Sequence, residues 1–359
     1  MKFNIDPDIK KAETLPGSFY KDDVVFEMLR NKVFKTTWHF IEGIDLSSQN
    51  NALPVNILEG FLQEPLLITR DNEDNLECLS NVCTHRANLL VHEPKKSSSI
   101  ICAYHGRKFN LEGKFQSMPE FNEAENFPRE CDHLKKFPLE HLGSHLFTSI
   151  DPRFDFNKIA DPINERVGFL PIDQFQFRSD LSKSYLVNAH WALYCDNYLE
   201  GFHIPFVHKD LNAVLDYKNY ETILFDYCNL QIGYSAGGEE VFELPKDHID
   251  YGKQIAAYYY WVYPNMMFNF YPWGLSLNIV IPLSKNKTKV KFLTYVYDET
   301  KLEQGAGAML DKVEREDEFV VEGVHKGLQS SSYTTGRFSP TREKGVHHFH
   351  SLLAKFINE

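Results

Sequence analysis

Two short segments decide the fold, Cys83-Thr84-His85-Arg86 and Cys102-Ala103-Tyr104-His105-Gly106. The first contains a Cys-x-His motif, and after sixteen intervening residues the second contains a Cys-x-x-His motif. Two thiolates and two imidazoles on two tight loops predict a metal site with four ligands. A structural zinc ion with two cysteine and two histidine ligands has the same ligand count and is the first interpretation.

The order of the ligands favours a second interpretation, a Rieske [2Fe–2S] cluster, in which two cysteines hold one iron and two histidines hold the other. Zinc fingers usually group Cys with Cys and His with His. Here each segment supplies one cysteine and one histidine, as is needed when each loop must touch both irons. Neutral imidazoles in place of two thiolates raise the reduction potential of such a cluster to about −150 to +300 mV.

Length and composition narrow the class of protein. The 359 residues allow about two domains, and the net charge of −12 has the wrong sign for binding nucleic acid or anionic lipid. Residues 1–11 lack the apolar segment of a signal peptide, and no apolar run approaches the roughly 18 residues that span a membrane. Six cysteines are too few for a disulfide framework and fit reduced thiols. We therefore expect a cytoplasmic protein with no nucleic-acid and no membrane partner.

The hydrophobic patterns predict an N-terminal arm and two domains. Residues 1–38 contain an amphipathic helical segment, residues 39–150 read as short β-strands separated by turns, and residues 151–359 mix helical and strand periods. The fold class is therefore α+β. The expected strands are 66–69, 100–104, 146–150, 258–262 and 275–281, and the expected helices are 191–201 and 309–328.

A second group of possible metal ligands lies in the segment 196–208. His203 and His208 are five positions apart, so on an unbroken helix the second ring would point roughly 140° away from the first. Pro205 lies between them and is expected to end the helix, which lets the chain turn His208 back toward His203. Two ordinary histidines near a helix end are the alternative. The neighbouring cluster motif favours a metal site.

A carboxylate on a third segment completes this group. Four valines share one face of the predicted helix 309–328: Val313, Val320, Val321 and Val324. Asp317 falls near the centre of that face and Glu316 at its edge. The other acidic residues are expected to point elsewhere: Glu314, Glu318 and Glu322. A buried carboxylate costs several kcal/mol unless it is paired or bound to a cation, so Asp317 either binds metal or pairs with a core arginine. Two histidines and one carboxylate form the facial triad of O₂-activating ferrous iron.

Both motifs resemble those of the oxygenase component of Rieske non-heme iron oxygenases, and the resemblance spans nearly the whole chain. Gly106-Arg107-Lys108-Phe109 and Gly113-Lys114-Phe115 continue the cluster-loop pattern of that family. Further stretches resemble the choline monooxygenase-like branch of ring-hydroxylating dioxygenases: 15–20, 195–199, 263–265, 324–330 and 347–350. Residues 200–203, Glu-Gly-Phe-His, are one residue shorter than the Asp-Gly-Gly-Tyr-His of choline monooxygenases, so the substrate stays open.

The resemblance implies an all-β Rieske domain at 39–150, a helix-grip (Bet v1/START-like) catalytic domain at 151–359, and an arm, 1–38, that packs on the catalytic domain. It implies a [2Fe–2S] cluster held by Cys83, His85, Cys102 and His105, and a mononuclear Fe(II) held by His203, His208 and Asp317. The catalytic residues would be Glu200, which links a Rieske histidine of one subunit to an iron-ligating histidine of the next, and Asn197, whose alternative is a polar helix position.

The implied protein is a terminal oxygenase and a homotrimer. A separate NAD(P)H-dependent reductase or ferredoxin supplies electrons, and O₂ is used to hydroxylate or N-demethylate a small molecule. A quaternary amine of the choline, betaine or carnitine type is the first candidate substrate, and an aromatic ring is the alternative. Two other classes stay open, a Rieske electron carrier and a zinc-stabilised ligand-binding protein.

Overall fold

The computed structural model describes residues 2–44, 49–71, 73–208, 221–235, 237, 240–302 and 310–359. The chain forms two compact units, Lys35–Arg153, and Met1–Phe34 together with Phe154–Glu359. The smaller is here called the cluster unit and the larger the catalytic unit. The expected boundaries at 38 and 150 lie a few residues from the boundaries of these units. Strands dominate the first unit and helices accompany a large sheet in the second, so the predicted α+β class is confirmed.

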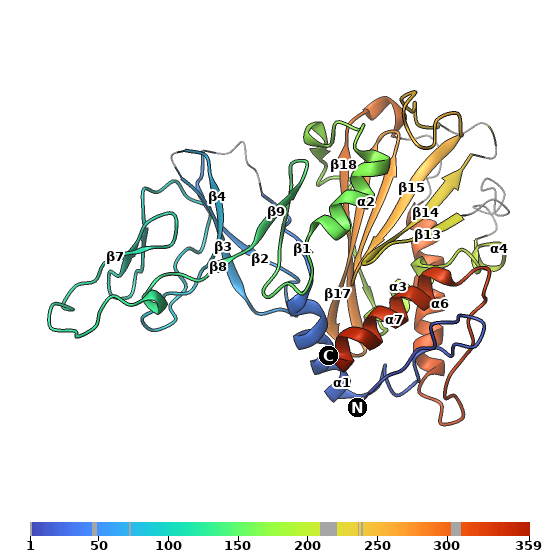
Figure 1. Cartoon of the computed structure of the whole chain (residues 1–359), viewed down its shortest axis with the longest axis horizontal. Coiled ribbons are helices and arrows are strands. Elements are labelled where there is room, and N and C mark those ends of the chain that lie inside the picture. The colour runs from blue at the N-terminus through green and yellow to red at the C-terminus, as the bar shows by residue number, and fades with distance from the viewer. Residues whose placement is uncertain are drawn as a thin grey trace. The chain divides into compact units, whose positions relative to one another are not determined.

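The cluster unit contains three small antiparallel sheets, in the orders β2-β3-β4-β8, β5-β6-β7 and β1-β10-β9 (Figure 1). Their bounds are β1 His39–Phe40, β2 Ala52–Asn56, β3 Pro65–Arg70, β4 Leu76–Ser80, β5 Ile100–Ile101, β6 Lys108–Phe109, β7 Phe115–Ser117, β8 Lys136–Phe137, β9 Leu139–Leu142 and β10 His145–Thr148. A 3-10 helix, η3, spans Glu130–Asp132. One buried cluster of side chains joins the first two sheets, and it includes Leu67, Leu79 and Phe109 with Cys83 and Cys102.

The strand expected at 100–104 is shorter than predicted, because β5 ends at Ile101. From Cys102 the chain turns sharply. The Gly106 N–H donates to the Cys102 carbonyl at 3.0 Å, and the Cys102 N–H donates to the Arg107 carbonyl at 2.8 Å. Gly106 has φ +73°, which a side chain would disfavour. The turn therefore removes Tyr104 and His105 from the strand and presents them on a loop.

The catalytic unit is built on an antiparallel sheet in the order β11-β18-β17-β16-β15-β14-β13, with β12 also pairing with β18. The bounds are β11 Gln176–Phe177, β12 Lys183–Val187, β13 Glu221–Leu224, β14 Cys228–Tyr234, β15 Ile255–Val262, β16 Met266–Tyr271, β17 Gly274–Ser284 and β18 Lys287–Val296. The expected strands 258–262 and 275–281 lie within β15 and β17. Strands β14 to β18 follow one another in space as in sequence, so this part of the sheet is a meander.

Helices accompany both faces of this sheet. They are α1 Asp23–Met28, continued by a π-helix at Leu29–Val33 and a 3-10 turn at Phe34–Thr36, then α2 Asn157–Val167, α3 Trp191–Tyr198, α4 Ile204–Val207, α6 Leu310–Gly327 and α7 Lys344–Asn358, with 3-10 turns at Ile172–Gln174 and Glu299–Lys301. The helix expected at 309–328 is thus α6. Residue 309 lies outside the described residues.

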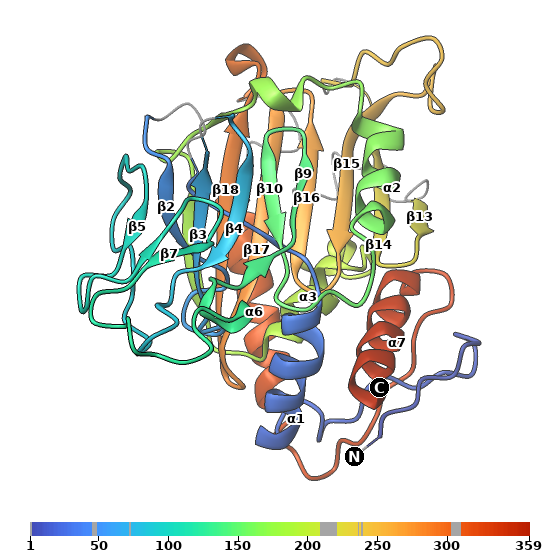
Figure 2. The ribbon, with the colours of Figure 1, turned by 60° about the vertical axis from the view of Figure 1, so that its left-hand side comes forward.

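Two neighbouring side chains of β15 show which helix covers which face. The Tyr260 hydroxyl donates to the Pro162 carbonyl of α2 at 2.7 Å, whereas the Trp261 ring packs edge-on against Phe349 of α7, with centroids 5.1 Å apart. Successive side chains of a strand point to opposite faces. Helix α2 therefore covers one face and α7 the other, and Figure 2 shows α2 along β14 and β15.

The N-terminal arm packs on α7 within the catalytic unit. The Leu15 N–H donates to His350 Nδ1 at 3.1 Å, and Lys32 Nζ donates to the Ile357 carbonyl at 2.7 Å. His350 and Phe349 are both buried. The histidines near the C-terminus therefore belong to a packed helix.

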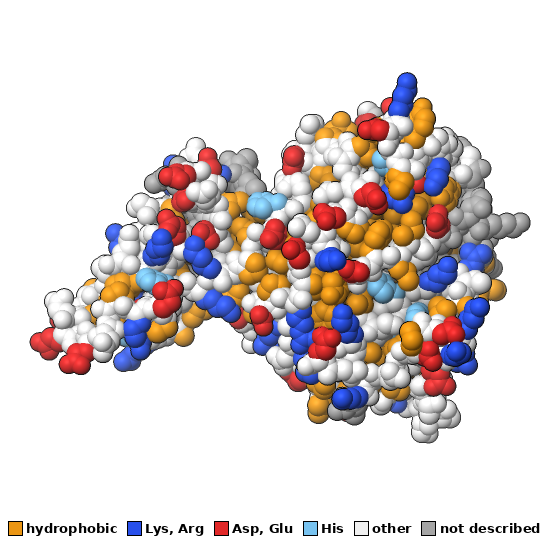
Figure 3. Space-filling view, in the orientation of Figure 1, with side chains coloured by type: hydrophobic (Ala, Val, Ile, Leu, Met, Phe, Trp, Pro, Cys, Tyr) orange, Lys and Arg blue, Asp and Glu red, His pale blue; other side chains and the backbone are white. Residues whose placement is uncertain are grey.

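On its visible face the protein shows no strong segregation of charge (Figure 3). None of the helices in the described parts of the chain is both long and apolar enough to cross a membrane. On the face drawn in Figure 3, acidic and basic side chains are interspersed over both units.

Candidate metal centres

Both candidate histidines of the catalytic unit follow the end of helix α3. Helix α3 ends at Tyr198, and Glu200 Oε2 then accepts hydrogen bonds from the backbone N–H groups of Phe202 and His203, which closes a tight turn. Pro205 lies in the first turn of the short helix α4, where its missing N–H costs nothing. The expectation that Pro205 ends the preceding helix was wrong, because the Glu200 turn ends it and Pro205 starts the next.

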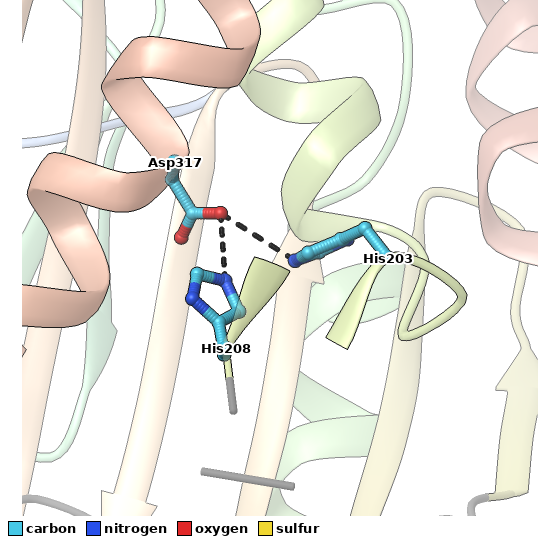
Figure 4. Close-up of side chains that lie close together, drawn as sticks. All are labelled: His203, His208 and Asp317. Carbon is cyan, nitrogen blue, oxygen red and sulfur yellow. Dashed lines mark hydrogen bonds and ion pairs between the residues drawn. The ribbon is translucent and has the colours of Figure 1, made fainter. Parts of the chain in front are cut away.

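The structure brings His203, His208 and Asp317 together (Figure 4). His203 and His208 flank α4, and Asp317 faces them from α6. Asp317 Oδ1 lies 2.9 Å from His208 Nε2 and 3.4 Å from His203 Nε2, and potential ligand atoms of all three lie within 4.8 Å of one another. The His208 side chain is 1% exposed, whereas those of His203 and Asp317 are each 16% exposed. Protein therefore encloses the group on the side of His208, whereas His203 and Asp317 remain partly accessible to solvent.

A carboxylate lies against the outer nitrogen of each histidine. Glu200 Oε1 is 2.7 Å from His203 Nδ1, and Glu316 Oε2 is 2.8 Å from His208 Nδ1. With Nδ1–H donating to these carboxylates, each Nε2 lone pair points to the shared centre, which is the usual arrangement around a histidine-ligated metal. Burial works to lower the pKa of His208, but the hydrogen bonds and charges of Asp317 and Glu316 raise it overall. The site thus favours a positive charge.

Asn197 also contacts the group. Its Nδ2 donates to Asp317 Oδ1 at 2.9 Å, from the last turn of α3. The next residue, Tyr198, donates its hydroxyl to Asn269 Oδ1 of β16 at 2.7 Å, which ties this end of α3 to the sheet. Asn197 is therefore positioned to orient the carboxylate of Asp317.

The inward face of α6 differs from the valine face predicted from the sequence. Glu314 is buried and accepts hydrogen bonds from the Tyr194 hydroxyl at 2.7 and 2.8 Å, whereas Val324 is 47% exposed. The expectation that Glu314 points elsewhere was wrong. The buried face of α6 carries carboxylates, because a tyrosine hydroxyl donates to Glu314 and two imidazoles contact Asp317. Among the described residues the ion-pair partners of Asp317 are the two histidines, not an arginine. The side chain of Val313 lies outside the described residues.

In the cluster unit the cysteines of the two ligand loops lie together, and so do their histidines. The side chains of Cys83 and Cys102 lie in the same buried cluster of side chains, and the rings of His85 and His105 lie with centroids 4.8 Å apart at 72°. Each loop is closed by its own backbone hydrogen bonds, from Ala87 N–H to the Cys83 carbonyl at 2.9 Å and from Gly106 N–H to the Cys102 carbonyl. The thiols thus lie inward, and the imidazoles lie nearer the surface.

The donor atoms fit an iron–sulfur cluster. His105 Nδ1 is buried and has no hydrogen-bond partner among the described residues, as expected of an atom reserved for a metal. Burial, with electrostatic repulsion from His105, Arg86 and Arg107, lowers the pKa of His85, which keeps its imidazole neutral. Burial alone would raise the pKa of Cys102, yet it lies below its usual value because neighbouring N–H groups, beginning with that of Tyr104, donate to the thiolate.

Comparison with known families defines the class of protein. Residues 48–138 match the Rieske [2Fe-2S] domain, and residues 176–359, about half of the chain, match the catalytic domain of the ring-hydroxylating alpha subunit. The chain therefore belongs to the ring-hydroxylating alpha-subunit family of Rieske oxygenases. It is an oxidoreductase and a terminal oxygenase that carries a Rieske [2Fe–2S] cluster and a mononuclear iron, and it requires a separate electron donor. The electron-carrier and zinc-protein interpretations do not hold.

Individual relatives show which members of this family the chain resembles. It is 30% identical, over 97% of its length and 84% of the relative's, to the chloroplastic choline monooxygenase of Arabidopsis thaliana. It is 25% identical, over 98% and 95%, to the carnitine monooxygenase oxygenase subunit of Escherichia coli strain K12. The crystal structure of the quaternary ammonium Rieske monooxygenase CntA with L-carnitine is 21% identical, covers 99% of each chain and gives a TM-score of 0.75. A naphthalene 1,2-dioxygenase from Rhodococcus sp. is 15% identical, covers 96% and 94%, and gives 0.70.

Proposed function

We propose that this chain binds its two metal groups through the seven side chains that the sequence singles out. The cluster ligands are Cys83, His85, Cys102 and His105, and the iron ligands are His203, His208 and Asp317. The observation that carries the proposal is the convergence of the iron ligands with a carboxylate on each outer histidine nitrogen. Bound Fe(II) activates O₂, and the cluster supplies electrons to it.

Glu200 passes electrons between subunits of a homotrimer, from the cluster of one chain to the iron of the next. Its Oε1 already contacts His203 Nδ1 at 2.7 Å, and its side chain is 15% exposed, so it is accessible to a neighbouring subunit. Inter-subunit electron transfer is known for a structurally similar quaternary ammonium Rieske monooxygenase. The electron donor is an NAD(P)H-dependent reductase or a ferredoxin, and the protein acts in the cytoplasm.

The substrate is a small quaternary amine of the choline, betaine or carnitine type, which is hydroxylated at one C–H bond or loses an N-methyl group. The support is sequence similarity along nearly the whole chain to choline and carnitine monooxygenases. The similarity to naphthalene dioxygenase concerns the fold alone and does not favour an aromatic substrate.

Two experiments test these proposals. With a surrogate reductase, choline, glycine betaine or carnitine should stimulate O₂ uptake matched by an oxidised product, whereas turnover of simple arenes alone would overturn the substrate class. At saturating Fe(II), Glu200→Gln should keep both metals but nearly abolish turnover. Glu318→Gln, on α6 and without a contact to the iron ligands, is the control. Full activity of Glu200→Gln would contradict the role of Glu200 in electron transfer.

A further inference from the structure

Asp132, at the end of η3, contacts both predicted cluster loops. Its carbonyl oxygen accepts a hydrogen bond from Thr84 Oγ1 at 2.9 Å, between the two ligands of the first loop. Its carboxylate accepts a hydrogen bond from Arg107 Nη2 at 2.7 Å, two residues beyond the last ligand of the second loop. Asp132 therefore connects the loops from outside the ligand set.

Arg107 is buried, with its side chain only 2% exposed, although burying a guanidinium without compensation is costly. The compensation comes from Asp132, which is itself held by the Arg129 backbone N–H at 2.8 Å. Three phenyl rings surround the guanidinium, with centroids 5.1 to 5.8 Å from Cζ: Phe109, Phe115 and Phe127. The ion pair and the rings fix the position of this positive charge.

The ring cage extends to a predicted cluster ligand. Phe127 packs against Phe121 with centroids 4.9 Å apart, and Phe121 packs edge-on against His85 at 5.6 Å. The rings that surround Arg107 therefore continue to the place where the cluster binds.

We propose that Arg107 and Asp132 form a buried clamp that holds the two cluster loops together and sets the reduction potential of the cluster. Reduction adds one electron from an external reductant, and so one negative charge, to the cluster. A fixed positive charge nearby stabilises that state and a fixed negative charge opposes it. Both are positioning residues, and the proposal rests on the cluster ligands proposed above.

The test is a reduction potential measured on the full-length protein by dye-mediated titration with dithionite, followed by visible absorption and electron paramagnetic resonance. Arg107→Met should disfavour reduction by on the order of tenfold, about 59 mV for a one-electron couple, and Asp132→Asn should favour it. The double variant should return close to the wild-type potential. Arg129→Met is the control, because the Arg129 side chain also contacts Asp132 but is 65% exposed and screened by water.

Shifts of the same sign in Arg107→Met and Asp132→Asn, or no shift in either, would overturn the clamp. Should Arg107→Met lose the cluster, the sign of the Asp132→Asn shift decides alone. A wild-type protein without a [2Fe–2S] signal would instead overturn the proposed ligand set. The two proposals therefore fail in distinguishable ways.

Discussion

Glu316 offers the sharpest test of the iron site, because it contacts a proposed ligand without being one. Its Oε2 lies 2.8 Å from Nδ1 of His208, whose ring is buried. Glu316→Gln keeps an acceptor oxygen but removes the charge. Glu316→Ala removes the acceptor and leaves a buried N–H without a partner. We expect both variants to weaken Fe(II) binding, the second more than the first.

The size of each effect follows from the surroundings. Loss of a carboxylate behind a metal-bound histidine costs roughly 10–100-fold in metal affinity. The Glu316 side chain is 32% exposed, so water screens its charge, and we expect about tenfold, or about 1.4 kcal/mol, for the glutamine variant. An unsatisfied buried donor adds about 1–3 kcal/mol to that loss, so the alanine variant should weaken Fe(II) binding by roughly 100-fold or more.

The assay is anaerobic competition for Fe(II) against a chelator of known affinity, at constant [2Fe–2S] content. Glu318→Gln is the matched control, since it removes a carboxylate two residues along the same helix that does not contact the ligands. Equal iron affinity in Glu316→Ala and Glu318→Gln would refute the argument that Glu316 orients His208.

Three further predictions concern stability and the cluster. Cys102→Ser should lose acid-labile sulfide, whereas Cys78→Ser, at an equally buried thiol, should keep it. Burial, with the charge of His325, lowers the pKa of His190 to about 3, so the unfolded chain takes up the proton first. Acidification from pH 6.5 to 5 should therefore destabilise the fold by about 1.6 kcal/mol, and His190→Asn, which can still cap α3, should flatten that dependence in urea titrations. Asp250→Asn breaks the buried pair with Arg166 and should cost about 3–5 kcal/mol in the same titrations; a loss below 1 kcal/mol would contradict it.

The ligand types could be predicted from the sequence because their chemistry is local. Cys-x-His and Cys-x-x-His identify a mixed ligand set without any knowledge of the fold, and in the structure the two cysteines share one buried cluster while the two histidine rings pack against each other. His203 and His208 could be paired only by assuming a break between them. No break lies between them: they flank the single turn of α4, and the preceding helix ends before His203, where Glu200 accepts two backbone N–H groups, an effect that residue propensities do not describe.

Apart from Glu200, three residues before His203, most side-chain contacts around the ligands could not be predicted, because they join residues that lie far apart in sequence. The contact between Arg107 and Asp132 joins residues 25 apart, and that between Tyr194 and Glu314 joins residues 120 apart. A helical wheel assumes that the buried face is the apolar one. On α6 that assumption fails, since a tyrosine hydroxyl and two imidazoles provide a polar surface in the interior.

Because Glu316 and Asp317 are adjacent on α6, this one helix can both supply a proposed iron ligand and orient His208. Neighbouring residues on a helix point about 100° apart, so they cannot serve the same atom. They can serve the two nitrogens of one imidazole, and His208 lies between them, with Nδ1 toward Glu316 and Nε2 toward Asp317. A change of register in α6 by one residue would remove both contacts at once. The position of α6 beside α4 therefore determines the ligand geometry and the orientation of His208 together, whereas His203 depends on Glu200 in its own turn.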